Sequence, residues 1–238
     1  MNSRENQNKF IVTFDKSRKS ETNVIVISTK EELEIYIFLL EEKVSIDKNM
    51  LPENISTEFI NDTSHIGLVN KISILKKKLF LKCLENVTIF DSNNKENMCR
   101  KVNKYDVHKV NSNNVMISNF ESTLKSKIKL FIGDVTKSEE ILIDHAQPDH
   151  IEAILLTEMC RQAAICTFST EYSSLSQFFI IEEYKKYHYI VNRQEQIYIQ
   201  TALLPQKARL NLCAFTLYQN NKMCMSGYFI GMKKAELQ

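Results

Sequence analysis

The sequence predicts an α+β protein in which antiparallel strands pack against two helices. Two stretches have the apolar spacing of a helix, at about residues 30–43 and 151–170. Each is preceded by two short strand-like stretches and followed by about four more, so the two halves of the chain repeat one order of elements. Helices followed by runs of strands, instead of alternating with them, are typical of α+β folds with antiparallel sheets.

Composition limits the class of protein. The 238 residues suffice for one or two domains, and 43% hydrophobic with 25% charged residues is typical of globular chains. A net charge of +2 gives no indication of a nucleic-acid partner. No apolar stretch approaches the roughly 20 residues of a membrane helix, and because residues 1–9 are polar we expect no secretion signal there. The six cysteines form no C-x-x-C pair, which favours reduced core thiols in the cytoplasm over a zinc site.

The first half begins with strand-like stretches at residues 9–14 and 23–27, which are rich in β-branched and aromatic residues. Ser28 and Thr29 each precede a glutamate by three residues, which is the spacing of a capping box at a helix start. The predicted helix follows directly. Further strands are expected at residues 55–60, 67–75, 79–90 and 98–102.

The second half repeats this order. Strands are expected at residues 114–120 and 127–132, before the helix at 151–170. Apolar residues cover more than one face of this helix, as expected if a curved sheet wraps around it. Four more strands are expected, at residues 178–191, 196–203, 209–218 and 223–232, with Asn220-Asn221 forming the last hairpin turn.

The second helix also carries the polar residues of greatest interest. Glu158, Arg161 and Gln162 are three and four residues apart, so they project from one face of an otherwise apolar helix. They form either a solvated stripe or subunit contact, or a carboxylate and a guanidinium directed into a cleft. In a cleft, the carboxylate suits a general base and the arginine suits a phosphate or carboxylate ligand.

The segment that leads into this helix contains two Asp-His pairs. They are Asp144-His145 and Asp149-His150. No further ligands stand at metal-binding spacing, so we expect no metal and no cofactor here. We expect these histidines to orient a neighbour or to contact a substrate. The chain also lacks a glycine-rich phosphate loop, since it has only four glycines.

At these positions the chain resembles the A-factor biosynthesis (AfsA-like) hotdog domain family. Asp149-His150, Leu155-Leu156 and the run from Glu158 through Arg161 to Ala164 are similar to that family's DH…LLxE…RQAA signature. Two further matches lie on either side, and the resemblance covers about residues 105–232. They are Tyr105–Lys109 with Val115–Ser118, similar to VHK…EVLLTD, and Gln177-Phe178-Phe179, similar to QFL.

The resemblance implies a hotdog fold, in which an antiparallel sheet wraps a central helix. The family is also similar to the 3-hydroxyacyl-ACP dehydratases, and its members contain two hotdog units that form a pseudo-dimer. Residues 105–238 would be the hotdog domain, and residues 1–104 a degenerate unit or an α+β extension. Two departures stand out: Glu152-Ala153 replaces the family's Pro-Gly, and the first half has no E-x-x-R-Q.

The resemblance also implies an activity. It is the transfer of a β-ketoacyl group from an acyl carrier protein to the hydroxyl of dihydroxyacetone phosphate, in γ-butyrolactone signal synthesis. Glu158 and Arg161 would be catalytic, and the substrate-binding residues would be Gln162, His150, Asp149 and His145. Expected partners are an acyl-ACP or acyl-CoA thioester and dihydroxyacetone phosphate, within a pseudo-dimer or a homodimer. Alternatives are an acyl-thioester hydrolase or dehydratase, or a non-catalytic acyl-binding or scaffold protein.

Overall fold

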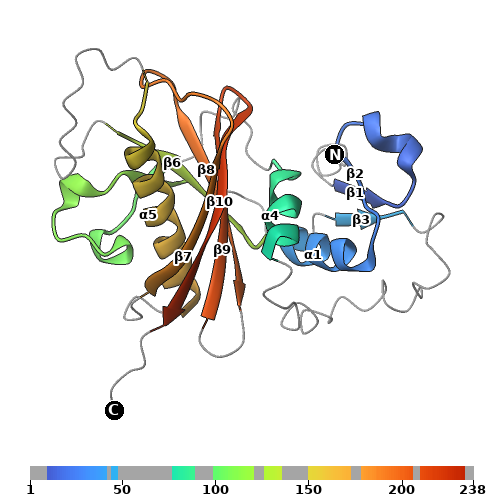
Figure 1. The fold of residues 1–238 in the computed structure, drawn as a ribbon, viewed down its shortest axis with the longest axis horizontal. Helices are drawn as coiled ribbons and strands as arrows, with labels where there is room; N and C mark the ends of the chain where they lie inside the picture. The colour runs from blue at the N-terminus through green and yellow to red at the C-terminus, as the bar shows by residue number, and fades with distance from the viewer. Residues whose placement is uncertain are drawn as a thin grey trace, which may run out of the picture. The chain divides into compact units, whose positions relative to one another are not determined.

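The computed structural model describes eight segments of the chain: residues 10–41, 44–47, 77–88, 99–120, 126–135, 150–172, 178–205 and 210–233. They fall into two compact units (Figure 1). The first comprises Met1–Asn86 with Thr123–Lys127, and the second comprises Val87–Ser122 with Ile128–Gln238. Within these segments, no helix is both long enough and apolar enough to cross a membrane.

The first unit contains a small parallel sheet and two helices that contact each other. Its strands are ordered β2-β1-β3 and its elements are β1 (Phe10–Thr13), η1 (Lys16–Ser20), β2 (Val24–Val26), α1 (Lys30–Leu40), β3 (Val44–Ile46) and α4 (Lys77–Glu85). The expected capping box is confirmed: the Thr29 side chain accepts from the Glu32 N–H at 3.2 Å, and Glu32 accepts from the Thr29 N–H at 3.3 Å.

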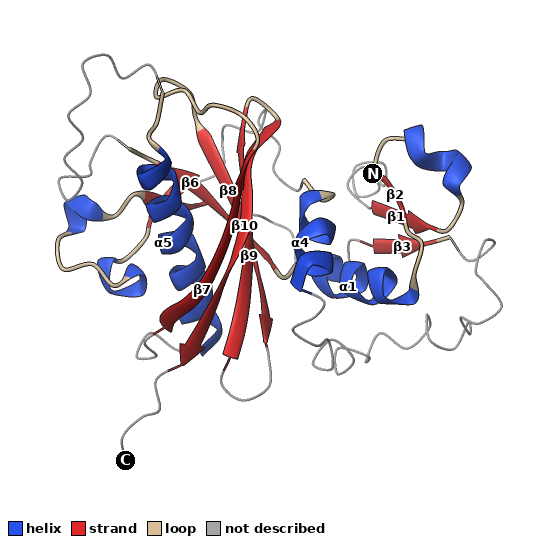
Figure 2. Cartoon of the chain, viewed as in Figure 1, coloured by secondary structure: helices blue, strands red, loops and turns tan. Residues whose placement is uncertain are grey.

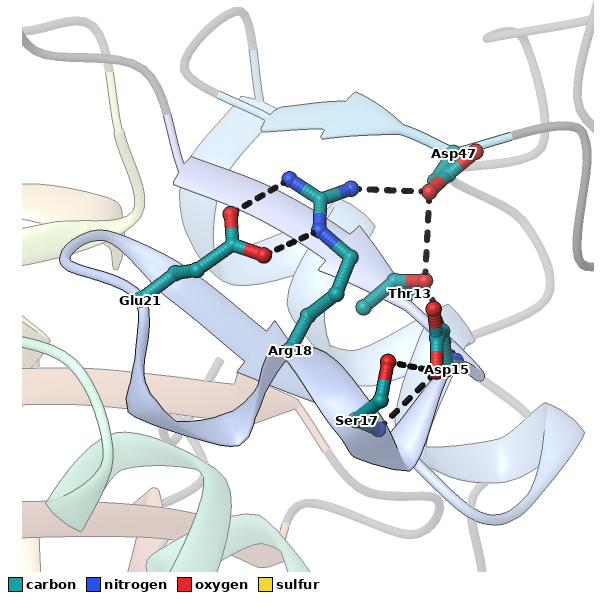
Figure 3. A network of polar contacts seen from close by, with 6 residues as sticks. All are labelled: Thr13, Asp15, Ser17, Arg18, Glu21 and Asp47. Atoms are coloured by element: carbon teal, nitrogen blue, oxygen red, sulfur yellow. Dashed lines mark hydrogen bonds and ion pairs between the residues drawn. The ribbon is translucent and has the colours of Figure 1, made fainter.

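A polar network joins the ends of β1 and β3 to η1 (Figure 3). Arg18 donates two hydrogen bonds to the Glu21 carboxylate, at 2.7 and 2.8 Å, and one to Asp47 at 2.9 Å. Asp15 caps η1 by accepting from the Ser17 N–H at 2.9 Å. The network therefore stabilises a turn and a strand end close to solvent.

Two elements of the first half differ from the prediction: β3 was not expected, and α4 was expected to be a strand. Residues 79–90 were expected to form a strand, but α4 spans Lys77–Glu85. Phe80 and Leu81 are buried, and so is Leu84, which lies one helical turn after them. A short apolar run fits either a strand or a helix, and here the favourable helix propensity of Leu and Lys agrees with the helix. The strands expected at residues 55–60 and 67–75 lie outside the described residues.

The second unit is a seven-stranded antiparallel sheet with one long helix packed against it (Figures 1 and 2). The strand order is β4-β5-β6-β8-β9-β10-β7. The strands are β4 (Cys99–Lys101), β5 (Ile117–Phe120), β6 (Ile128–Gly133), β7 (Phe178–Tyr187), β8 (Ile197–Pro205), β9 (Leu210–Gln219) and β10 (Lys222–Lys233). The helices are η6 (Lys104–Val107), η7 (Ser112–Asn114) and α5 (Ala153–Tyr172).

The core of this unit forms between α5 and the sheet. Met159, Cys160, Ala163, Ala164 and Phe168 on α5 are all fully buried. They pack with residues of β5 to β10, and α5 contacts β5, β6, β8 and β9. Apolar residues on several sides of α5 thus lose their water-accessible surface, which is the main stabilising contribution here. An antiparallel sheet packed around one buried helix confirms the expected hotdog fold.

The predicted elements of this half agree with the structure to within a few residues. The exception is the strand expected at residues 178–191, because β7 ends at Tyr187. The idea that residues 1–104 form a degenerate hotdog unit stays a prediction. Large parts of that range lie outside the described residues, and the described strands β1 to β3 pair in parallel, unlike those around α5.

Candidate functional site

The polar face of α5 meets the segment that follows η6. Gln162 is fully buried. The Glu158 side chain is 14% exposed and the Arg161 side chain 30% exposed. Lys109 contacts Glu158, and the backbone of residues 114–116 contacts Gln162, so this face of α5 is covered by the segment after η6. Glu158, Arg161 and Gln162 therefore lie together on one face of α5, as their spacing in the sequence predicted.

Glu158 and Arg161 form a two-point ion pair. Arg161 Nε donates to Glu158 Oε2 at 2.6 Å, and Nη2 donates to Oε1 at 2.8 Å. This parallel geometry is the strongest that a guanidinium forms with a carboxylate. It fixes the guanidinium plane relative to the helix.

Lys109 is a third member of this cluster. Its Nζ lies 3.0 Å from Glu158 Oε1, and its side chain is only 9% exposed. Buried lysines are found almost only when they are paired. The sequence motif Tyr105–Lys109 includes this residue, but no role was predicted for it. The sequence did contain one indication of its importance, because Lys109 lies inside a motif that resembles one of a known family.

Gln162 connects the cluster to the opening segment of the unit. Its Nε2 donates to the Asn114 carbonyl at 2.9 Å and to Glu158 Oε1 at 3.0 Å. Its Oε1 accepts from the Met116 N–H at 2.9 Å. These bonds hold residues 114–116 against α5. Its predicted contact with substrate stays a prediction, and its observed bonds are all internal.

The environment of Glu158 keeps it charged. Burial alone would raise the pKa of its carboxyl. The hydrogen bonds and positive charge of Arg161, together with hydrogen bonds from Gln162 and Lys109, outweigh this effect, so the pKa lies below its ordinary value. Lowering the pKa of a carboxyl makes its carboxylate a weaker proton acceptor. Its geometry suits the orientation of two cations better than the removal of a proton.

His108 lies directly before Lys109 and ends η6 in the left-handed backbone region, with φ of 56°. Its side chain is exposed. Partial burial and the positive charge of Arg161 lower the pKa of the imidazole. At neutral pH the ring is therefore mainly unprotonated, so it can accept a proton. No role was assigned to this histidine from the sequence.

His150 lies just before the first turn of α5. It borders a cleft of about 400 Å³, together with Leu156, Tyr187, His188 and Ile190. Its Nε2 is 3.9 Å from the Glu152 carboxylate. Neither Glu158 nor Arg161 lines this cleft, so the structure separates His150 from the charged cluster. His145 and Asp149 lie outside the described residues.

A family model matches the second half of the chain. Residues 90–203 match the model of the A-factor biosynthesis hotdog domain. No curated protein matches the chain.

Solved structures are similar at low identity. A sigma28-regulated virulence protein from Campylobacter jejuni is 12% identical, with a TM-score of 0.42 over 54% of this chain and 91% of that one. A hypothetical thioesterase with coenzyme A from Streptococcus pneumoniae is 7% identical, with a TM-score of 0.37 over 47% and 81%. A mutant of the phenylacetic acid degradation protein PaaI from Thermus thermophilus is 9% identical, with a TM-score of 0.37 over 45% and 86%. At these values the likenesses assign no activity.

The matched segment contains Lys109, Glu158, Arg161 and Gln162, and it contains α5 with the strands β4 to β7 and most of β8. Motif, fold and family model therefore agree. Residues 90–203 thus match the family that the motifs predicted, the A-factor biosynthesis hotdog domain.

Proposed function

We propose that the second unit transfers a β-ketoacyl group from an acyl thioester to the hydroxyl of dihydroxyacetone phosphate. The observation that carries this proposal is the cluster of Lys109, Glu158 and Arg161 inside the segment that matches the family. The donor would be an acyl carrier protein or coenzyme A thioester. The product would be an acylated phosphate ester of the kind needed for γ-butyrolactone synthesis.

Arg161 is the proposed phosphate-binding group. Its side chain is partly exposed, and Glu158 fixes the plane of its guanidinium. Lys109 and Arg161 place two positively charged side chains beside the Glu158 carboxylate. A guanidinium held in a fixed plane suits a phosphate, because its parallel donors match two phosphate oxygens. Glu158 is then a positioning residue.

His108 is the proposed general base. It is exposed beside the cluster, and its lowered pKa leaves the ring able to accept a proton at neutral pH. The acceptor hydroxyl gives its proton to His108 while its oxygen attacks the thioester carbonyl. The carbon–sulfur bond then breaks, and the departing thiolate takes the proton. These steps need no further reactant.

The experiment is a product analysis with the full chain. Purified protein is mixed with a β-ketoacyl thioester, with and without dihydroxyacetone phosphate, and the products are identified by mass spectrometry. We expect an acylated phosphate ester only when the acceptor is present. Arg161→Ala should abolish its formation.

Arg18→Ala is the matched control, because Arg18 also forms a two-point pair with a glutamate but belongs to the first unit. It should leave turnover unchanged. Failure of the wild-type chain to acylate the acceptor, or full activity of Arg161→Ala, would refute the proposal.

A second candidate is hydrolysis of the thioester, and the cleft at the start of α5 is the observation that favours it. This cleft places His150 beside apolar residues such as Leu156 and Ile190. The same experiment separates the two functions. Loss of thioester without the acceptor indicates a hydrolase, and loss that depends on His150 places the reaction in the cleft. Acyl binding with no turnover indicates a binding protein.

A further inference from the structure

The connection from β7 to β8 and the hairpin from β9 to β10 lie at the end of the sheet where α5 begins (Figure 1). Residues of both line a second cleft, of about 530 Å³. This volume is within the range of small-molecule sites. The cleft is separate from the charged cluster, since neither Glu158 nor Arg161 lines it.

Hydrogen bonds join the two walls of this cleft. Gln219 is buried, and its Nε2 donates to the Asn192 carbonyl at 2.8 Å and to the Glu195 carbonyl at 3.1 Å. Its Oε1 accepts from the Asn192 N–H at 2.8 Å. Asn220 Nδ2 donates to a carboxylate oxygen of Glu195. These bonds fix the shape of the cleft, and small-molecule sites are usually pre-formed in this way.

Two opposite charges, on Lys222 and Glu195, face this cleft. Burial is the main cause that raises the pKa of the Cys224 thiol, which also lines the cleft. The charge of Lys222 lowers that pKa and the charge of Glu195 raises it, so both charges lie near this thiol. Among the residues that the structure describes, neither charge forms an ion pair with an oppositely charged side chain. Both can therefore interact with a ligand.

An aromatic and an aliphatic side chain also line the cleft. Tyr189 and Ile190 are 61% and 82% exposed. The Lys222 Nζ lies 6.0 Å from the centre of the Tyr189 ring, so apolar surface lies beside the positive charge. Apolar side chains that gather at a cleft with a few polar groups are typical of a ligand site, whereas single exposed ones are not.

These groups together limit the class of ligand. Lys222 attracts an anion such as a phosphate, but Glu195 repels it, and a cation meets the reverse. A zwitterion is attracted by both charges. An α-amino acid with an apolar side chain has a carboxylate, an ammonium group and a surface that Tyr189 and Ile190 can cover.

We infer that this cleft binds a free α-amino acid with an apolar side chain. Its carboxylate pairs with Lys222, its ammonium group pairs with Glu195, and its side chain packs against Tyr189 and Ile190. The inference goes beyond the proposed reaction, because such binding needs no thioester. Tyr189 and Ile190 also line the cleft that contains His150, so the bound amino acid would lie beside that cleft.

The test is isothermal titration calorimetry of the full chain with L-phenylalanine and L-leucine as probes. N-acetyl-L-phenylalanine lacks the ammonium group, and L-phenylalaninamide lacks the carboxylate. We expect both amino acids to bind. Each derivative should bind roughly 3- to 10-fold more weakly than L-phenylalanine, because it loses one charge-assisted contact. Glycine should also bind more weakly, because it has no side chain to bury.

Two variants test the individual contacts. Glu195→Gln should weaken the binding of L-phenylalanine but not that of N-acetyl-L-phenylalanine, which has no ammonium group to lose a partner. Lys222→Gln should weaken the binding of L-phenylalanine but not that of L-phenylalaninamide. The matched controls Glu182→Gln and Lys186→Gln remove the same charges from exposed residues of β7 outside the cleft, and they should bind like the wild type. Circular dichroism checks that all four variants are folded.

Several outcomes would overturn the proposal. They are no binding of either amino acid, equal affinity for L-phenylalanine and its two derivatives, or binding that neither Glu195→Gln nor Lys222→Gln changes. Coenzyme A serves as a further probe. Binding of coenzyme A that Lys222→Gln weakens, without binding of an amino acid, would assign the cleft to a different ligand.

Discussion

Each of the two units contains an Arg–Glu pair with a spacing of three residues, and the two pairs have different surroundings. In the first unit, Arg18 and Glu21 are bonded at 2.7 and 2.8 Å, with side chains 27% and 47% exposed (Figure 3). In the second, Arg161 and Glu158 are bonded at 2.6 and 2.8 Å, and the glutamate is only 14% exposed. The bond lengths alone do not distinguish them.

The distinction lies in the other partners of each glutamate. Glu158 also receives bonds from Lys109 and Gln162, so one carboxylate joins α5 to the segment after η6. Glu21 lies near solvent in the turn after η1, and among the described interactions its carboxylate bonds only the neighbouring Arg18. Water screens an exposed pair, whereas a buried charge must be matched by its partners. We therefore expect the stability of the protein to depend much more on the Glu158–Arg161 pair than on the Arg18–Glu21 pair.

Removal of the buried carboxylate should have the largest effect. Glu158→Gln leaves Lys109 and Arg161 close together without their shared anion, so we expect the free energy of unfolding to fall by about 3 kcal/mol. Urea denaturation measures this. The matched change Glu21→Gln should have little effect, because water screens that exposed pair. Equal losses in the two variants would show that the comparison is mistaken.

Removal of the buried lysine should have a smaller effect. Lys109→Met keeps most of the side-chain volume and leaves Glu158 paired with Arg161, so a loss of about 1 kcal/mol is expected. The control is Lys82→Met, since Lys82 also lies 3.0 Å from a glutamate, Glu32, but is 60% exposed. If the cluster binds phosphate, Lys109→Met should also raise the KM for the acceptor more than it lowers kcat, which steady-state kinetics can show.

The charge of Glu158 should also appear in the pH dependence of stability. Its pKa in the folded protein is lowered, so the unfolded chain binds the proton more readily. The stabilisation is therefore complete above the unfolded pKa of about 4.5 and is lost as the pH falls through the folded value. Urea midpoints for wild type and Glu158→Gln should differ most at neutral pH and converge in acid. If the difference between the two urea midpoints does not shrink in acid, the stabilisation does not come from the charge of Glu158.

Much of the hotdog unit was predictable because its signals are local. The apolar pattern placed α5 within two residues at each end, and the spacing of Glu158, Arg161 and Gln162 put them on one face. Lys109 was missed because it meets Glu158 across 49 positions of the chain, a contact that no helical or strand period encodes. The general-base role expected of Glu158 depended on its pKa, which is set in part by that same non-local contact. In the first unit, α4 was mistaken for a strand because its apolar run is short.

The smallest effect on stability is expected at His108, where the interest lies in activity. The ring is exposed, so His108→Gln should leave the urea midpoint unchanged. If the ring is the general base, kcat should fall on the order of 100-fold, and the acidic limb of the pH profile should disappear with it. The midpoint of that limb should lie at a pH below the ordinary pKa of histidine, because burial and Arg161 lower the pKa of this ring. His188→Gln, which alters a ring bonded to Ser226 in the same unit, should keep the limb. Retention of the limb in His108→Gln would show that another group is the base, and His108 would then be only a neighbour of the proposed phosphate-binding residue Arg161.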